Sequence, residues 1–252
     1  MMLRCYANGH TGTTAFFRNR PLLTELMALL APARVPVRVL FHACSVGAEP
    51  YSLALWWRHH APPDAADSLA IEATDIDPEF LETARRGVYP ISVLDSLSAR
   101  ERSWLAPHAD GVQVPACVRS MVRVLPPMSF VAPALIGRYD AVCIMNALTY
   151  VTPGEQRQAI VTAGRHARRV VALTAFHPDT IAEDVSAAGL MPWSGQQRAI
   201  HEAWGDRLVD GPVPPESPYY SFQLPRQMAD VPDAAARYGA LFVPMASAHQ
   251  AR

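Results

Sequence analysis

The sequence has 252 residues and a formal net charge of −1; half of its residues are hydrophobic and 18% are charged. This composition is typical of a globular chain that buries a sizeable core, and the near-zero charge argues against nucleic acid as a partner. The N-terminus has no apolar signal-peptide core, and no apolar run reaches the length of a membrane span. We therefore expect a soluble, cytoplasmic protein that does not bind membranes.

The four cysteines lie far apart in the chain and show no paired spacing: Cys5, Cys44, Cys117 and Cys143. Such spacing predicts neither a zinc site nor a disulfide framework. Reduced thiols and no bound metal are the expectation.

The hydrophobic pattern predicts alternating helices and strands after a polar, turn-rich start at residues 1–13. In chain order we expect a helix over 20–31, strand 38–44, helix 51–60, strand 69–74, helix 78–86, helix 98–105, strand 121–125, strand 139–145, helix 153–167, strand 169–175 and helix 179–188. This alternation indicates an α/β fold with a mostly parallel sheet covered on both faces.

The pattern changes to β-like after Pro192, with possible strands at 198–203 and 219–224. Strands there would be an antiparallel addition to the C-terminal end of the sheet. We expect one catalytic domain over residues 1–225, with a shortened insertion at 90–120, and a C-terminal tail over 226–252 that forms a short helix at best.

Polar residues follow three of the predicted strands: Ser45–Glu49, Asp75 and Asn146. In an open α/β sheet, ligands bind beyond the carboxyl ends of the strands. Gly47 lets the backbone approach a ligand closely or adopt a positive φ. Asp75 is placed to accept hydrogen bonds from a ribose diol, and Glu49 at a helix start could hold an ammonium group.

The loop after the first of these strands has one glycine and an acid, whereas a pyrophosphate site requires a glycine cluster. The negative charge of Glu49 suits a cationic ligand, which favours S-adenosylmethionine (SAM) over a dinucleotide. The alternative is an ordinary strand–helix turn that is capped by Ser45.

Four ordered segments resemble the CheR-type SAM-dependent methyltransferases, which esterify chemoreceptor glutamates. Residues 43–52 read ACSVGAEPYS and look like the family signature, and residues 14–18 (TAFFR) match its upstream segment. Residues 73–77 (ATDID), with Ala84 and residues 87–89, are similar to its second motif. Tyr139, Asp140 and residues 146–150 resemble a later one. The resemblance covers roughly residues 12–178 and implies a class I, Rossmann-like, doubly wound sheet.

The resemblance also implies roles for matching positions. It places Arg18 and Tyr150 near the reactive methyl group, as catalytic residues. The amino group of the cofactor would be bound by Glu49, the ribose by Asp75 and the adenine by Ile76. The full set of implied cofactor-binding residues is Thr14, Ala43, Ser45, Gly47, Glu49, Asp75, Ile76, Met128 and Asn146.

Several of these residues also have a structural interpretation. Phe16 and Phe17 are expected to be core aromatic residues, and Tyr150 could be a structural hydroxyl group. Asp77 precedes Pro78 and is expected to cap a helix rather than to bind a ligand.

The sequence departs from the family in its extent and in its pocket. Residues 1–13 leave no room for the family's N-terminal helical domain, and residues 90–120 look too short for its receptor-docking β-subdomain. Met145 stands where the family has an arginine, and Met128 where an asparagine is expected near the adenine. Both changes make the predicted pocket more apolar.

These departures favour methyl transfer to a small molecule or a carrier-bound intermediate in biosynthesis, with S-adenosylhomocysteine as product. One alternative is attack on the γ-carbon of the methionine part of SAM, for example cyclisation to a small amino acid with release of methylthioadenosine. Two others are a chemoreceptor glutamate methyltransferase and a SAM-binding protein without turnover. The acceptor and the oligomeric state stay open.

Overall fold

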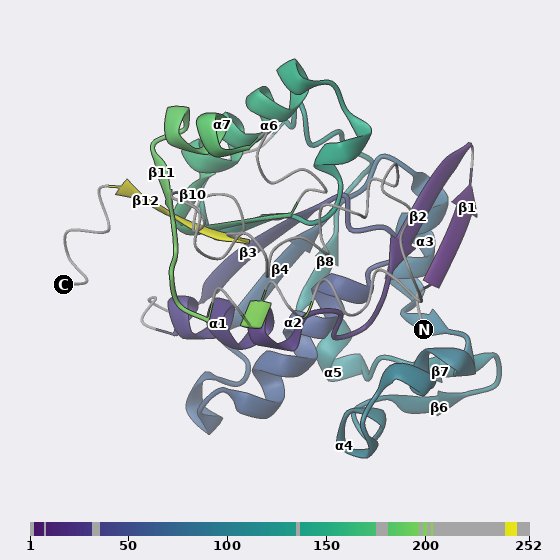
Figure 1. The fold of residues 1–252 in the computed structure, drawn as a ribbon. Helices are drawn as coiled ribbons and strands as arrows, with labels where there is room; N and C mark the ends of the chain where they lie inside the picture. The colour runs from purple at the N-terminus through teal and green to yellow at the C-terminus, as the bar shows by residue number, and fades with distance from the viewer. Residues whose placement is uncertain are drawn as a thin grey trace. The chain divides into compact units, whose positions relative to one another are not determined.

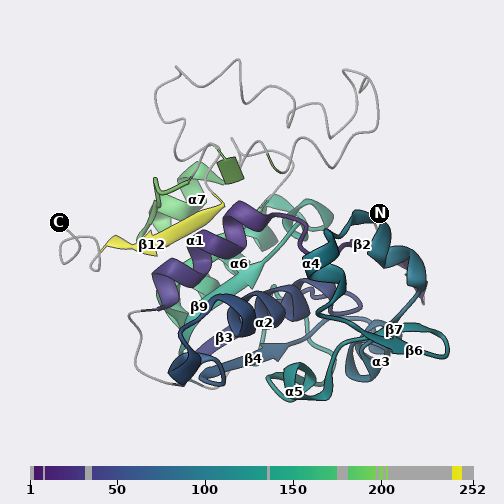
Figure 2. The ribbon, with the colours of Figure 1, turned by 90° about the horizontal axis from the view of Figure 1, so that it is seen from below.

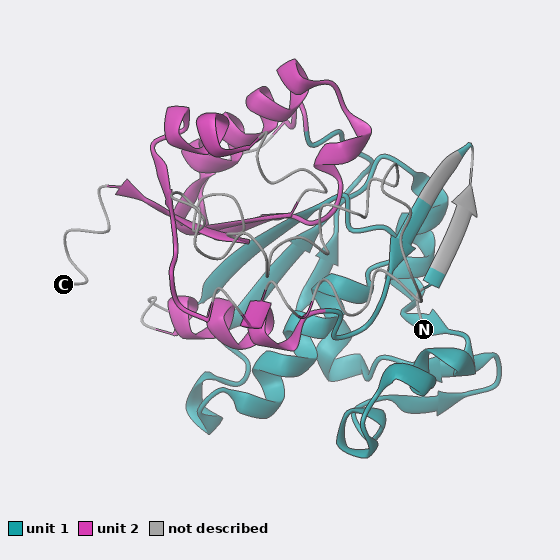
Figure 3. Cartoon of the chain, viewed as in Figure 1, with its two compact units in different colours: residues 1–18, 33–130 teal, residues 19–32, 131–252 magenta. Residues whose placement is uncertain are grey.

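A computed structural model describes residues 3–7, 9–31, 36–134, 137–174, 181–196, 199–200, 203 and 240–245. The chain divides into two compact units, shown in Figure 3. Unit 1 comprises residues 1–18 and 33–130, and unit 2 comprises residues 19–32 and 131–252. Both units contain helices and parallel strands, which confirms the predicted α/β class.

Unit 1 is built on three parallel strands, with β4 (Leu69–Ala73) between β3 (Val37–His42) and β8 (Val122–Val124). The inner positions of β3 and β4, such as Val39, Leu40 and Ile71, are almost fully buried. Helix α2 (Ala48–His60) packs on β4, on β8 and on the short α5 (Ala116–Arg119), and Figure 2 shows α2 running beside the strands. β3 is buried at five of its six positions, which explains why its sequence is a nearly continuous apolar run.

The helices that follow the first two parallel strands begin and end at residues suited to those positions. Helix α2 starts after Gly47, whose φ of 86° lies in the left-handed region. Helix α3 (Pro78–Arg86) is capped by Asp77, whose side chain accepts from the N–H groups of Glu79 and Phe80, and it ends at Gly87 with φ 61°. The prediction that Asp77 is a helix cap is confirmed, as are the predicted bounds of α3.

Two small antiparallel sheets complete unit 1, and the sequence analysis missed both. Strands β1 (Leu3–Ala7) and β2 (His10–Thr14) form a hairpin where a turn-rich segment was expected. Strands β5 (Val88–Tyr89), β7 (Gly111–Gln113) and β6 (Ala106–His108) form a second sheet, with the 3-10 helix η2 (Ile91–Ser96) and α4 (Ala99–Arg102) between β5 and β6. The insertion at 90–120, expected to be too short for the family's receptor-docking β-subdomain, contributes β6 and β7 to this small sheet.

Unit 2 contains the parallel pair β9 (Tyr139–Ile144) and β10 (Ala167–Leu173), followed outward by antiparallel β12 (Leu241–Pro244) and β11 (Leu190–Pro192). Helix α1 (Arg20–Leu30) packs on one face of β10, and α6 (Pro153–His166) packs on the other, with α7 (Ala182–Ala187) beside α6 (Figure 1). Helices thus cover both faces of these strands, as predicted.

The antiparallel C-terminal addition exists, but in a different part of the sequence. The predicted strand at 198–203 is wrong, because Ala199, Ile200 and Ala203 are helical. The predicted strand at 219–224 lies outside the described residues. The tail beyond residue 226 was expected to form a short helix at best, yet it contains β12. A strand of four residues gives too short an alternation for the sequence pattern to reveal it.

Among the helices in the described part of the chain, none is both long enough and apolar enough to cross a membrane.

Replacement of Gly47 by alanine should destabilise the protein. A Cβ at residue 47 would lie 2.9 Å from Ala84 Cβ, and the φ of 86° is strained for any residue with a side chain. We expect a loss of about 1–3 kcal/mol in the free energy of unfolding, measured by urea denaturation.

Gly154→Ala in α6 is the matched control, because a Cβ there meets nothing within 4 Å. This helical glycine should give a gain of about 0.5–1 kcal/mol on replacement by alanine. Equal effects of the two substitutions would contradict the proposed strain at Gly47.

Candidate functional site

The loop between β3 and α2 has an unusual backbone. Ala43 and Ser45 have φ values of 50° and 49°, and Gly47 has φ 86°. Positive φ is uncommon for residues other than glycine and costs on the order of 1–3 kcal/mol unless the surroundings enforce it. Such strain is concentrated at functional sites, which supports the prediction that this loop binds a ligand.

The carboxylate of Asp75, at the end of β4, holds this loop in place. Its Oδ2 accepts the Ser45 N–H at 2.7 Å, and its Oδ1 accepts the Asp77 N–H at 3.1 Å. Asp75 is buried, and burial raises its pKa, while the hydrogen bonds from backbone N–H groups oppose that rise. The Ile76 N–H also bonds to this carboxylate, so three of its roughly four acceptor sites are used and about one is left for a ligand hydroxyl.

Two buried tyrosines also hold the loop after β3 and the helix α2 in place. Tyr89 donates from its hydroxyl to the Val46 carbonyl at 2.7 Å, and Tyr51 donates to the Ala84 carbonyl at 2.7 Å. The first bond links the small sheet to the loop, and the second links α2 to α3. The loop is therefore fixed by neighbours that are distant in sequence.

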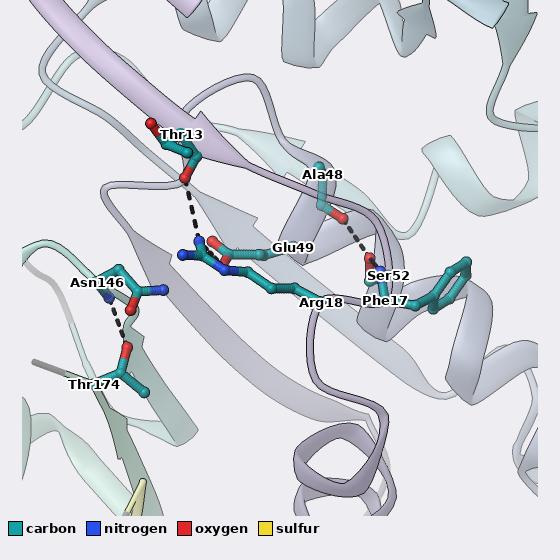
Figure 4. Close-up of polar contacts among 8 residues, drawn as sticks. All are labelled: Thr13, Phe17, Arg18, Ala48, Glu49, Ser52, Asn146 and Thr174. Carbon is teal, nitrogen blue, oxygen red and sulfur yellow. Dashed lines mark hydrogen bonds and ion pairs between the residues drawn. The ribbon is translucent and has the colours of Figure 1, made fainter. Parts of the chain in front are cut away.

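An ion pair lies at the start of α2, where Glu49 faces Arg18. Arg18 Nη1 lies 3.4 Å from Glu49 Oε1 and donates to the Thr13 carbonyl at 3.2 Å (Figure 4). Both side chains are largely withdrawn from solvent, with exposed fractions of 4% and 12%. Burial raises the pKa of Glu49 from 4.5 to about 7, although Arg18 opposes the rise.

Two buried hydroxyl groups beside the loop have no hydrogen-bond partner among the described residues: Thr14 Oγ1 and Ser45 Oγ. A buried polar atom without a hydrogen-bond partner lowers stability by about 1–3 kcal/mol. Such atoms are therefore usually hydrogen-bonded to a ligand or to water. A Cβ at Gly12 would overlap Ser45 Oγ, so β2 passes very close to the loop. Two orphaned hydroxyls and two carboxylates fit a ligand that carries hydroxyl and ammonium groups.

Ile76 and Met128 lie next to Asp75 and add apolar surface. Ile76 is 55% exposed, which is unusual for a large hydrophobic residue. The Met128 N–H donates to the Asp75 carbonyl at 2.9 Å, which brings the segment after β8 to the end of β4. An exposed isoleucine beside a strand end could pack on a flat apolar ring.

Unit 1 thus brings together most of the predicted site residues: Thr14, Arg18, Ala43, Ser45, Gly47, Glu49, Asp75, Ile76 and Met128. Asn146 and Tyr150 belong to unit 2. Asn146 follows β9 with φ 54°, and its N–H donates to Thr174 Oγ1 at 2.7 Å. Tyr150 lies in the 3-10 helix η3 (Leu148–Tyr150) and is 65% exposed.

Phe16 and Phe17 are fully buried, as expected of core aromatic residues. The sequence analysis assigned no role to Thr13, Ser52 or Tyr89. Ser52 and Tyr89 lie within motifs that match the family, and this position in a motif could have indicated a role in the site. The Thr13 contact uses a backbone carbonyl, which no residue pattern can reveal. No group of three or more metal-ligating side chains occurs within the described ranges.

Comparison with known proteins identifies a family. The model of the CheR methyltransferase SAM-binding domain matches residues 12–184. A chemotaxis protein methyltransferase of Vibrio parahaemolyticus is 32% identical over 152 residues, which are 57% of this chain and 55% of that protein. Chemotaxis protein methyltransferase 2 of Pseudomonas aeruginosa is 33% identical over 149 residues, 56% and 53% of the two chains. The chain spans about half the length of these curated relatives.

Among solved structures, a magnesium protoporphyrin IX methyltransferase from Synechocystis with bound SAM gives a TM-score of 0.41 at 16% identity. The likeness covers 69% of this chain and 70% of that chain.

The raised pKa of Glu49 predicts a specific pH dependence of stability. The folded protein retains this proton up to about pH 7, whereas the unfolded chain releases it near 4.5. The stabilisation that results from the protonated Glu49 carboxyl group is therefore complete below pH 4.5. It is lost as the pH rises through 7. Glu49→Gln should remove this loss, so its stability relative to wild type should increase between pH 5 and pH 8, on the order of 2–3 kcal/mol.

Urea unfolding at a series of pH values measures the difference. Glu82→Gln, which changes an exposed helical carboxylate, is the control and should keep the wild-type profile. Parallel profiles for Glu49→Gln and wild type would show that Glu49 does not titrate in this way.

Proposed function

This chain belongs to the CheR methyltransferase family, and we propose from that premise that it binds SAM at the loop after β3 and transfers the methyl group to an acceptor. The observation that carries the proposal is the pair of buried carboxylates, Glu49 at the start of α2 and Asp75 at the end of β4. Glu49 lies at the strand–helix turn where a dinucleotide-binding protein has a glycine cluster for pyrophosphate, and Asp75 lies at the end of the next strand, where an acid can bind a ribose. The charge of Glu49 would repel a pyrophosphate and attract an ammonium group, and Asp75 would accept from a ribose diol.

We propose the following roles for the residues of unit 1. Asp75 accepts from the ribose diol through the acceptor site that its backbone contacts leave. Glu49 accepts from the amino group, and Arg18 at 3.4 Å favours its ionised form against the effect of burial. The orphaned hydroxyl groups of Thr14 and Ser45 supply further polar contacts.

The apolar and backbone positions complete the proposed pocket. The positive φ values of Ala43 and Gly47 shape the loop, while Ile76 and Met128 border the adenine. We assign Asn146 to the cofactor pocket and Tyr150 to the reaction centre, in keeping with the family motif they match.

When bound, SAM supplies an activated methyl group on a sulfonium, so the protein mainly aligns the acceptor and excludes water. Arg18 is a cation fixed by Thr13 and Glu49, and a fixed cation can orient a negatively charged acceptor without rearranging during the reaction. Tyr150 is 65% exposed, so part of its side chain faces solvent.

Two observations favour a protein as the acceptor. The curated relatives are named chemotaxis protein methyltransferases. In addition, residues 88–113 form the β5–β7–β6 sheet, so the predicted loss of a small β-sheet no longer argues against a protein substrate. We propose a side-chain carboxylate as the methylated group, in line with the cationic Arg18.

A small molecule or carrier-bound intermediate is the second candidate. Its support is the presence of Met128 and Met145 at positions where the family has polar residues. Met145 is buried directly after β9 in unit 2, and Met128 is half-buried in unit 1.

Product analysis with SAM labelled in its methyl group tests the proposal. Incubation with candidate acceptors should yield S-adenosylhomocysteine and, for a protein carboxylate, a label that base releases as methanol. Base-stable label on a small molecule would favour the second candidate. Release of methylthioadenosine instead would overturn methyl transfer and point to attack at the γ-carbon.

Asp75→Asn should weaken binding of S-adenosylhomocysteine by about 10- to 100-fold in calorimetry. The amide has one acceptor oxygen for three backbone N–H groups, so at least one donor loses its partner at about 1–3 kcal/mol and no acceptor is left for the ribose. Asp77→Asn is the matched control, because asparagine caps helices as well as aspartate does. Similar losses in both variants would argue against a specific role for Asp75.

A further inference from the structure

Ser52 occupies a position from which one hydroxyl group connects two parts of the proposed site. It lies in the second turn of α2 and is buried, with an exposed fraction of 2%. Its Oγ accepts the Phe17 N–H at 2.8 Å and donates to the Ala48 carbonyl at 2.6 Å (Figure 4). The hydroxyl therefore joins the segment before Arg18 to the helix turn that carries Glu49.

The residue that Ser52 holds is in a strained conformation. Phe17 has φ 49°, in the left-handed region, where a bulky residue without glycine's freedom is a genuine outlier. A conformation of this kind persists only where the surroundings enforce it. The Ser52 hydroxyl supplies that constraint on the backbone side of Phe17.

The ring of Phe17 is held separately, by aromatic neighbours. It packs edge-on against Trp104 with ring centroids 5.5 Å apart, and lies tilted against Trp56 at 6.1 Å. These contacts fix where the ring lies, and the Ser52 hydroxyl holds the peptide N–H of the same residue. This hydrogen bond therefore contributes to the direction in which Arg18 leaves the turn.

We infer that Ser52 is a positioning residue, whose hydroxyl holds the left-handed turn at Phe17 against α2 and thereby sets the contact of Arg18 with Glu49. The inference rests on the proposed function, because it concerns how the same SAM site is kept ready for its ligand. Ser52 itself need not touch the ligand. Its effect is exerted through Arg18.

The consequence can be measured as a shift in pH dependence. Arg18 lowers the pKa of Glu49, which burial raises to about 7. If the guanidinium moves away, this carboxyl group keeps its proton to a higher pH and binds an ammonium group less well at neutral pH. The Cys44 thiol beside it has a pKa raised well above its usual value by burial, then by Asp75 and Glu49, so it stays neutral in this range.

The test measures the affinity of the full chain for S-adenosylhomocysteine between pH 6 and pH 9. Ser52→Ala should weaken binding about 5-fold at pH 7, the effect of raising a pKa of about 7 by one unit. Binding should recover towards wild type at pH 9. Thr83→Ala is the control: it removes a hydroxyl group that makes the same bond to a carbonyl four residues back, in α3, and it should leave the profile unchanged.

A double-mutant cycle separates positioning from general destabilisation. Arg18→Ala should shift the profile as Ser52→Ala does, and the double variant should be no worse than Arg18→Ala alone. Ser52→Cys retains the size of the side chain with a weaker acceptor, and should shift the profile in the same direction if the alanine variant does not fold.

The inference is overturned if Ser52→Ala binds like wild type, if its loss is equal at every pH, or if the losses add in the double variant. Absence of binding by the wild-type chain is a different result, and would refute the proposed function itself.

Discussion

The hydrogen bonds of the Asp75 carboxylate are the constraint on which the site depends. Ser45 has a positive φ that only enforced surroundings maintain, and its N–H is bound by this carboxylate at 2.7 Å. The second oxygen binds the N–H of Asp77, the residue that caps α3. One buried carboxylate therefore fixes the loop after β3 and the start of the helix after β4. Without it the strained loop would lose its main partner.

The sequence predicted the parallel strands of unit 1 and the helices α2 and α3, because local signals and tertiary structure agree there. The bounds of α3 follow from a capping aspartate, a proline at the first helical position and a glycine at the end. The strands β3 and β4 are mostly apolar, and polar residues follow them at the strand ends, where α/β proteins bind ligands. Family membership agrees with the motifs that these residues form.

The short strands and several contacts of the site could not be predicted, because pairing between distant parts of the chain determines them. The strands β5, β6 and β7 have two or three residues each, too few for an alternating pattern, and β12 is added to the sheet from a distant part of the chain. Residues 199–203 have β-like composition but are helical where they are described, which shows tertiary structure overriding propensity. In the site, the Thr13 carbonyl and the Ser52 hydroxyl act through geometry rather than through residue type.

The mostly buried carboxyl group at the start of α2 couples ligand binding to the release of a proton. With a pKa of about 7, Glu49 carries a proton in a large fraction of ligand-free molecules at neutral pH. A cationic amine bound beside it would favour the ionised form, so each binding event would release a fraction of a proton to the solvent. The apparent heat of binding would then vary with the ionisation enthalpy of the buffer, and comparison of two buffers would count the protons released.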